Sequence, residues 1–146
     1  MYKVFYNQKP IFLKTDIEEI SDEFPLLYAK YTSVYSLMKA LKSKKVSGIN
    51  LYHPKREKLE MHFLKLFPMV EAAGGLVKHK DGRLLFIYRN NKWDLPKGKI
   101  EKKEIILKAA IREVSEETGV LNLIVSKPLP TTYHIYNANG RYKLKL

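Results

Sequence analysis

Residues 98–120 of this chain read GKIEKKEIILKAAIREVSEETGV. Seven of these positions carry Gly, Glu or Arg at fixed spacing, in the pattern G-x5-E-x7-R-E-U-x-E-E-x-G-U, where U is a bulky aliphatic residue. Gly and Glu each make up about 7% of residues in ordinary proteins, so seven specified identities coincide on the order of once in 10⁸ trials. A chain of 146 residues is far too short for such a coincidence. The stretch therefore indicates a specific functional element.

Three glutamates in this stretch are spaced to share one face of a helix. Glu113, Glu116 and Glu117 stand at i, i+3 and i+4, which brings their Cβ atoms within about 5–6 Å of one another. Like charges at this spacing repel, and a hard divalent cation reverses that repulsion. An acidic triplet on its own also fits a solvated helix face. The full pattern around the triplet favours a metal site that takes Mg²⁺, or Mn²⁺ in its place.

The complete pattern resembles the signature of the Nudix hydrolases, and every specified position matches. The resemblance covers residues 69–139, because a small-residue strand at 70–77, a turn at 81–82, an apolar strand at 83–89 and W-x-L-P at 93–96 precede the box. It implies an α/β fold, namely an α/β/α sandwich with a mixed sheet. The box would form a loop, a helix and a second loop, and Gly119 suits the left-handed residue that ends such a helix.

The resemblance also implies a metal-binding set. In this family the metal ligands would be the carbonyl oxygen of Gly98 and the carboxylates of Glu113, Glu116 and Glu117. All four supply oxygen, as Mg²⁺ prefers. The chain has no cysteine, so thiolate ligands and disulfides are excluded.

The catalytic candidates are four charged residues of the box: Glu117, Glu116, Arg112 and Glu104. Arg112 would orient the glutamates through charge-assisted hydrogen bonds, and Glu104 would support the metal site or add a carboxylate to it. Many family members carry a further carboxylate well after the box, but no Asp or Glu follows Glu117 here. Glu117 or Glu116 is then the expected general base, with His134 as another candidate by its ordinary pKa.

The substrate-binding candidates lie around the start of the box. Arg89, Lys97 and Lys99 are expected to contact phosphate, and Trp93 is expected to stack on a base. Three tyrosines are further stacking candidates, with core packing as the alternative: Tyr88, Tyr133 and Tyr136. The L-P-K-G variant at 95–98 is similar to the branch that includes diadenosine polyphosphate and diphosphoinositol polyphosphate hydrolases.

The function implied by the resemblance is a Mg²⁺-dependent pyrophosphohydrolase. Its substrate would be a nucleoside diphosphate linked to another moiety, such as a dinucleoside polyphosphate, ADP-ribose or a compound like a nucleoside triphosphate. The alternative is a catalytically weak or inactive Nudix module that binds a nucleotide or a protein partner. The intact box favours the enzyme, and the missing later carboxylate favours the module.

Two domains are expected, a small α+β extension at 1–67 and the Nudix domain at 68–146. In the extension, a hairpin is predicted over 2–14, and helices over 33–45 and 54–66. The short strand predicted between these helices spans 50–53. The extension is open to three roles: packing on the hydrolase core, homodimerisation and substrate selection.

After the box helix, which should begin near 101–104, a strand is predicted at 120–125 and a hairpin at 131–146 with its turn at Asn139-Gly140. Nudix domains usually continue further. We therefore expect a truncated C-terminal part, or completion of the sheet by the front segment or a second subunit.

The net charge is +12, from 27 basic and 15 acidic residues. A field of this sign attracts phosphorylated metabolites or nucleic acid, and it is also consistent with a lysine-rich soluble surface. The net positive charge is the only feature of the sequence that indicates nucleic-acid binding. No apolar run reaches the 18 or more residues of a membrane span, and the N-terminus lacks the order of a signal peptide, so a cytoplasmic protein with no membrane contact is expected.

Overall fold

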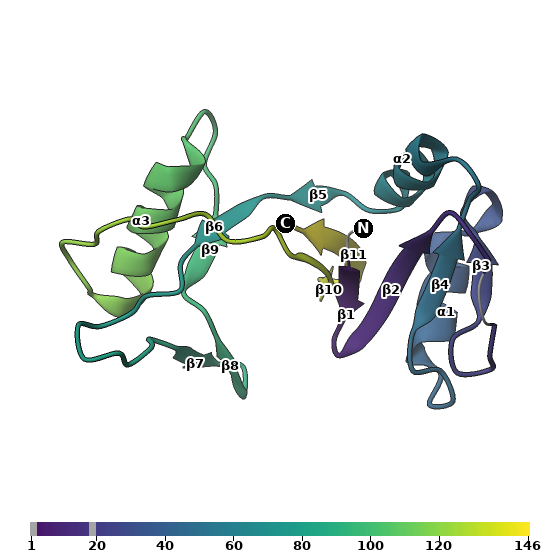
Figure 1. Cartoon of the computed structure of the whole chain (residues 1–146), viewed down its shortest axis with the longest axis horizontal. Helices are drawn as coiled ribbons and strands as arrows, with labels where there is room; N and C mark the ends of the chain where they lie inside the picture. Colours follow the sequence, from purple (N-terminus) through teal and green to yellow (C-terminus); the bar gives the residue numbers. More distant parts are fainter. Residues whose placement is uncertain (1–2, 18–19) are drawn as a thin grey trace. The chain divides into compact units, whose positions relative to one another are not determined.

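The structure is a computed structural model that describes residues 3–17 and 20–146 (Figure 1). The chain forms two compact units. Unit 1 takes in the chain up to Val70 together with Pro130–Leu146, and unit 2 is Glu71–Leu129. No helix among the described residues is both long and apolar enough to cross a bilayer.

Unit 1 is built on one mixed sheet of seven strands, in the order β3-β4-β2-β1-β10-β11-β5. The strands are β1 (Lys3–Tyr6), β2 (Lys9–Lys14), β3 (Leu26–Tyr28), β4 (Ile49–Tyr52), β5 (Met69–Val70), β10 (Tyr133–Ala138) and β11 (Arg141–Lys145). The pairs β1–β2 and β10–β11 are antiparallel hairpins, whereas β1 and β10 run parallel. The first hairpin and the last hairpin are therefore joined at the centre of the sheet, through β1 and β10.

Local sequence explains the two hairpins. Asn7 has φ 55° in the turn between β1 and β2, and Asn139 (φ 51°) with Gly140 (φ 84°) forms the turn between β10 and β11. Asn and Gly adopt this left-handed conformation at low cost. Both predicted hairpins are confirmed, although the predicted first strand begins at residue 2, which lies outside the described residues.

Two helices, α1 (Val34–Lys42) and α2 (Arg56–Leu66), and the short 3₁₀ turn η1 (Ala29–Tyr31) complete unit 1. A capping box starts α1. The Ser33 hydroxyl accepts a hydrogen bond from the backbone N–H of Ser36 (3.1 Å), and the Ser36 hydroxyl accepts one from the N–H of Ser33 (2.9 Å). Both helices predicted for the front segment are confirmed, with ends that differ by a few residues.

The core of unit 1 lies between the sheet and these helices, which pack on the same face. Its fully buried side chains come from both ends of the chain: Val4, Ile11, Leu37, Leu41, Ile49, Leu51, Phe63, Ile135 and Leu144. The front segment thus completes the sheet of the last hairpin, which was one of the open alternatives. The domain division at 67/68 stays a prediction, and compactness groups the hairpin with the front segment.

Unit 2 contains four short strands and one helix. The strands form two antiparallel pairs, β6 (Ala72–Gly74) with β9 (Lys97–Lys99), and β7 (Ile87–Arg89) with β8 (Lys92–Asp94). The helix is α3 (Ile106–Thr118), which lies against β6 and β9. Three α-helices and a mixed sheet among the described residues give the chain the α/β character expected of a Nudix fold.

The predicted buried strand at 83–89 is wrong over most of its length. Only its last three residues form β7, which pairs with β8 alone. Leu84, Phe86 and Tyr88 are exposed, with between 46% and 60% of their surface accessible. A two-stranded hairpin offers no second layer to bury these side chains.

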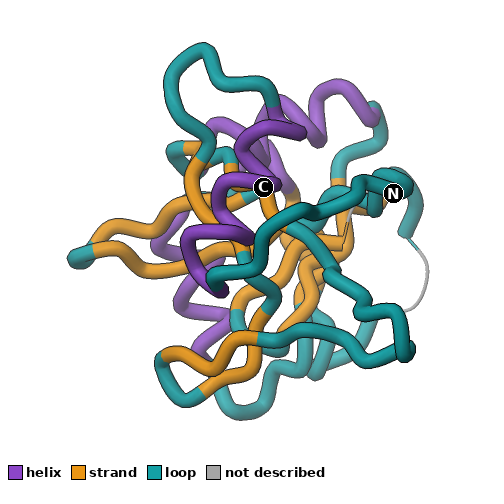
Figure 2. Tube along the Cα trace, turned by 90° about the vertical axis from the view of Figure 1, so that its left-hand side faces the viewer, coloured by secondary structure: helices purple, strands orange, loops and turns teal. Residues whose placement is uncertain are grey.

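The predicted strand at 120–125 is also wrong. A long loop without regular structure follows α3 as far as β10, and loops are drawn in teal in Figure 2. Ile124 is 94% exposed and Leu121 is 73% exposed. These apolar residues have strand propensity, but propensity alone does not supply a partner strand.

The apolar residues of the box helix and of the position before it are buried only in part. Ala109 and Val114 are buried, whereas Ile105, Leu107 and Ile111 are exposed. The sheet formed by β6 and β9 is only two strands wide, so it covers a narrow stripe of the helix.

Candidate active site on the box helix

The loop and strand before α3 bring the backbone of Gly98 against the helix. Gly98 lies in β9, which pairs with β6, and a Cβ placed on Gly98 would overlap the carboxylate of Glu113. Gly74 has a similar role in β6, because a Cβ there would overlap the carbonyl oxygen of Pro96 and the Cβ of Lys97. Two glycines therefore allow the strands and α3 to approach closely.

The helix α3 presents the three glutamates of the box. It ends at Gly119, whose φ of 72° gives the left-handed cap predicted for it, and whose N–H bonds to the carbonyl of Ser115 at 2.8 Å. The side chains of Glu113 and Glu117 are 13% and 21% exposed, whereas that of Glu116 is 59% exposed. Two of the three carboxylates are thus mostly shielded from solvent.

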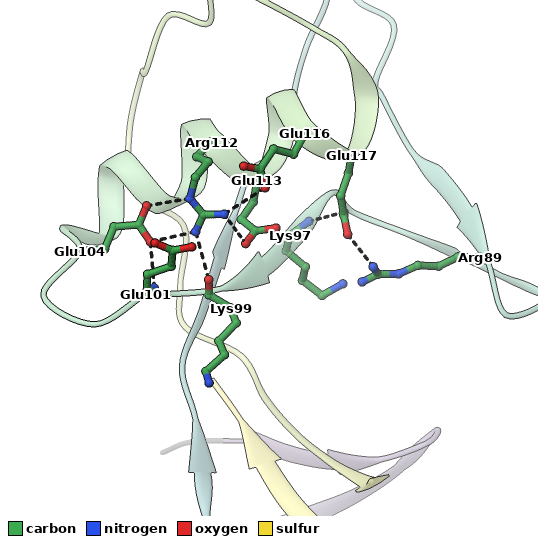
Figure 3. Close-up of polar contacts among 9 residues, drawn as sticks. All are labelled: Arg89, Lys97, Lys99, Glu101, Glu104, Arg112, Glu113, Glu116 and Glu117. Atoms are coloured by element: carbon green, nitrogen blue, oxygen red, sulfur yellow. Dashed lines mark hydrogen bonds and ion pairs between the residues drawn. The ribbon is translucent and has the colours of Figure 1, made fainter. Parts of the chain in front are cut away.

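Arg112 lies between the carboxylates and holds them through its guanidinium group (Figure 3). Its Nε and Nη2 donate to the two oxygens of Glu104, both at 2.8 Å. Its Nη1 donates to Glu113 (2.7 Å) and Glu116 (3.1 Å), and Nη2 also donates to the backbone carbonyl of Lys99 (3.1 Å). One side chain therefore connects the loop before the helix with two glutamates on the helix.

Glu104 is strongly held as an anion. The hydrogen bonds from Arg112, and then the bond from the backbone N–H of Glu101 (2.9 Å), lower the pKa of Glu104 to about 2. The same contacts with Glu104 and Glu113 raise the pKa of Arg112 above its ordinary value. Both partners stay charged throughout the physiological range.

Glu117 is held by groups other than Arg112. One oxygen accepts from Nη1 of Arg89 at 2.6 Å, and the other accepts from the backbone N–H of Lys97 at 2.8 Å (Figure 3). Asp94 forms ion pairs with the ammonium of Lys97 and with Arg89 (3.6 Å). The pKa of Asp94 is low: partial burial raises it, but the hydrogen bond and charge of Lys97 outweigh that effect.

The donor set fits a hard divalent cation in its chemistry. Glu113, Glu116 and Glu117 offer carboxylate oxygens from one helix, and the carboxylate of Glu113 lies against Gly98. Among residues 3–17 and 20–146, no three side chains of the ligating types converge on a common point. Two of these carboxylates are turned to Arg112 and the third to Arg89.

The other predicted site residues make fewer contacts with Arg112 and the box glutamates, or none that the structure shows. Trp93 is 72% exposed and lies 5.0 Å from the ring of Tyr88, centroid to centroid, on the β7–β8 hairpin. Lys99 contributes its carbonyl to Arg112, and its side chain is exposed. His134 is in β10 of unit 1, as are Tyr133 and Tyr136, whereas the box is in unit 2.

Asp94 is a residue of this site that the signature of the box does not include. It stands three residues before Lys97 and one residue after Trp93. This acid, set between a turn and a basic loop, was a signal for an ion pair.

The comparison with known families gives one match. The family model of the NUDIX domain matches residues 68–144, a little over half of the chain. No curated protein matches the chain.

Proposed function

Because this chain belongs to the Nudix family, we propose that it is a metal-dependent hydrolase that cleaves the phosphoric anhydride bond of a nucleoside diphosphate linked to another moiety. Mg²⁺ is the proposed metal, with Mn²⁺ as a substitute. Members of the family act on phosphoanhydrides. The nucleotide part of the substrate and the identity of the metal are proposed here in addition. The observation that supports it is the set of three glutamates on α3, one of which, Glu113, has its carboxylate against Gly98.

The residues of the chain have distinct tasks in this proposal. Gly98, Glu113, Glu116 and Glu117 would hold the metal, which when bound neutralises charge on the diphosphate and lowers the pKa of a bound water. Arg112 positions Glu113 and Glu116 through the hydrogen bonds described above. Either Glu116 or Glu117 accepts the proton of the attacking water.

Substrate binding is assigned to the basic and aromatic groups near β8 and β9. The guanidinium of Arg89 and the ammonium groups of Lys97 and Lys99 are suited to phosphate oxygens. Trp93 exposes most of its ring and is suited to stacking on a base. Arg89 and Lys97 are paired with carboxylates in this structure, so a phosphate would compete with Glu117 and Asp94 for them.

The test is phosphate release from a panel of substrates with saturating Mg²⁺. The panel should contain nucleoside triphosphates, ADP-ribose, dinucleoside polyphosphates and diphosphoinositol phosphates. We expect Glu117→Gln to lower kcat by roughly 10²-fold or more, the range of acid–base and metal-site losses. Glu101→Gln is the matched control, because only the backbone of Glu101 contacts the Arg112–Glu104 group. Near wild-type turnover of the Glu117 variant would refute its assignment to the site.

The second candidate function is a binding module without turnover. It is favoured by the pairing of Glu117 with the guanidinium of Arg89 and the backbone N–H of Lys97. No hydrolysis across the panel, combined with tight nucleotide binding in calorimetry, would favour the module. Metal-dependent turnover of any panel member would exclude it.

A further inference from the structure

The sheet of unit 1 has a second face, opposite the face on which α1 and α2 pack. Strand residues alternate between the two faces, and the core positions Val4, Ile11 and Ile135 identify the covered face. The residues between them point to the other side. Six ring side chains occupy this side across five adjacent strands: Tyr28, Tyr52, Phe12, Phe5, His134 and Tyr136.

Ring contacts join two pairs of these residues across neighbouring strands. The rings of Phe5 and His134 are stacked with centroids 5.8 Å apart, and those of Tyr28 and Tyr52 are 5.7 Å apart. Tyr28 is 37% exposed and His134 is exposed, whereas the other four rings are partly exposed. Phe24 lies beside Phe12, at 6.1 Å, on the same side.

Lysines are paired with these rings in the register of the sheet. Lys3 is opposite Phe12 and Lys14 is opposite Tyr52. In the last hairpin, Lys145 is opposite His134, and its ammonium also lies 5.1 Å from the ring centre of Tyr136.

Lys143 completes the set opposite Tyr136. Four of the six rings therefore have a lysine as the directly paired residue of a neighbouring strand, about 5 Å away. We call the six rings and four lysines the aromatic–lysine face.

Basic residues outnumber acidic residues in unit 1. The seven strands of the sheet contain no Asp or Glu in their described lengths. Residues 1–70 and 130–146 together carry 15 Lys and Arg against 7 Asp and Glu. A positive field therefore surrounds a surface of aromatic rings.

We propose that the aromatic–lysine face of unit 1 binds single-stranded nucleic acid, with bases stacked on its rings and phosphates contacted by its lysines. Proteins that hold single strands without strict sequence preference combine these two features, because each base has an aromatic face and each nucleotide a phosphate. A duplex keeps its bases stacked inside the helix, so the rings would find no partner there. This site lies outside the box helix, and the two proposals are independent.

The test is fluorescence anisotropy of labelled oligonucleotides of about 20 residues, oligouridylate and oligothymidylate, with a duplex of equal length as comparison. The ring variant is Phe5→Leu/Tyr52→Leu, which keeps apolar bulk and removes two aromatic faces. Its matched control is Tyr35→Leu, on the exposed side of α1. We expect the ring variant to bind single strands at least about fivefold more weakly, and the control to bind as wild type does.

The lysine variant is Lys3→Ser/Lys143→Ser, with Lys58→Ser/Lys65→Ser on α2 as a control of equal charge change. Each lost phosphate contact should reduce the slope of log K against log salt by about 0.7 for single strands. We therefore expect a change of about 1.4 in the lysine variant, and a smaller change in the α2 control. Circular dichroism and urea midpoints verify that all variants are folded.

Several results would overturn the proposal. They are no binding at low salt, equal binding of duplex and single strand, and equal weakening by the ring variant and its control. Binding to vesicles of phosphatidylglycerol and phosphatidylcholine without binding to oligonucleotides would assign the face to a membrane surface instead. Tight binding of either oligonucleotide supports the proposal. Hydrolysis of small substrates is expected to be unchanged in all these variants. The proposal for hydrolysis and the proposal for nucleic-acid binding can therefore be refuted independently of each other.

Discussion

At the scale of single residues, the contacts around Arg112 show which side-chain interactions the sequence pattern predicts and which it does not. The resemblance to the Nudix box identified Arg112 and its glutamates, and it implied that the arginine would hydrogen-bond to them. It did not predict that Glu117 pairs with Arg89 or that Asp94 pairs with Lys97. The contact between Glu117 and Arg89 depends on how the β7–β8 hairpin lies against α3, which no local pattern encodes, whereas Asp94 and Lys97 are only three residues apart in the sequence.

The low pKa of Glu104 leads to a prediction for acid stability. Because the pKa of Glu104 is about 2 in the folded chain and ordinary when unfolded, its contribution is present above about pH 4.5 and is lost as pH falls toward 2. We expect Glu104→Gln to lose less stability than wild type over that interval. Urea unfolding between pH 2 and 6 measures this, with Glu101→Gln as the control. Equal acid sensitivity of wild type and the Glu104 variant would contradict the assignment.

Gly98 offers a test that separates folding from catalysis. Its φ is not in the left-handed region, so alanine fits the backbone, but the new Cβ would displace the carboxylate of Glu113. We expect Gly98→Ala to change the free energy of unfolding by less than about 1 kcal/mol, because the displaced group is the end of a flexible side chain. Turnover should fall by roughly 10-fold or more. A variant that is fully active would show that the placement of Glu113 against Gly98 is not needed.

At the scale of elements, helices were easier to predict than strands. Periodic apolar residues and end signals such as Ser33 and Gly119 identified α1, α2 and α3 from local sequence. The apolar runs at 83–89 and 120–125 carry equally strong strand propensity, yet most of their residues are exposed and not in strands. A strand needs a partner, and the partner is a property of the fold.

The close packing of β6 and β9 depends on Gly74. A Cβ at this position would overlap the backbone carbonyl of Pro96 and crowd Lys97, which cannot move aside as a side-chain end can. We expect Gly74→Ala to destabilise unit 2 by about 1–3 kcal/mol. This destabilisation is measured by hydrogen exchange of the β6 and β9 amides, compared with the amides of unit 1. Unchanged protection in β6 and β9 would show that the strands can separate at little cost.

At the scale of the whole molecule, the family and the α/β class were predictable, but the strand order was not. The parallel pairing of β1 with β10 joins segments at opposite ends of the sequence, and neither segment carries a signal that names the other. The sequence leaves open a truncated C-terminal part, or completion of the sheet by the front segment or by a second subunit. The structure selects the front segment because Val4, Ile11, Ile135 and Leu144 share one core.

A disulfide provides a direct test of this topology, since the chain has no cysteine of its own. Phe5 and His134 are register partners in β1 and β10. We expect Phe5→Cys/His134→Cys to form an intramolecular disulfide on mild oxidation and to raise the urea midpoint. Mass spectrometry and free-thiol titration detect the bond. Phe5→Cys/Asn137→Cys is the out-of-register control, and equal cross-linking in both variants would contradict the pairing.

The pairing of β1 with β10 also affects the order in which the sheet of unit 1 can form during translation. Val4 pairs with Tyr133, which follows it by 129 positions, so the sheet of unit 1 has a high contact order and forms slowly. Residues 71–129, whose contacts are closer in sequence, leave the ribosome while β1 still lacks its parallel neighbour. Until β10 is synthesised, the edge of β1 that will pair with it is exposed and could pair with another chain. The lysines of β1 and β2 are suited to prevent such aggregation.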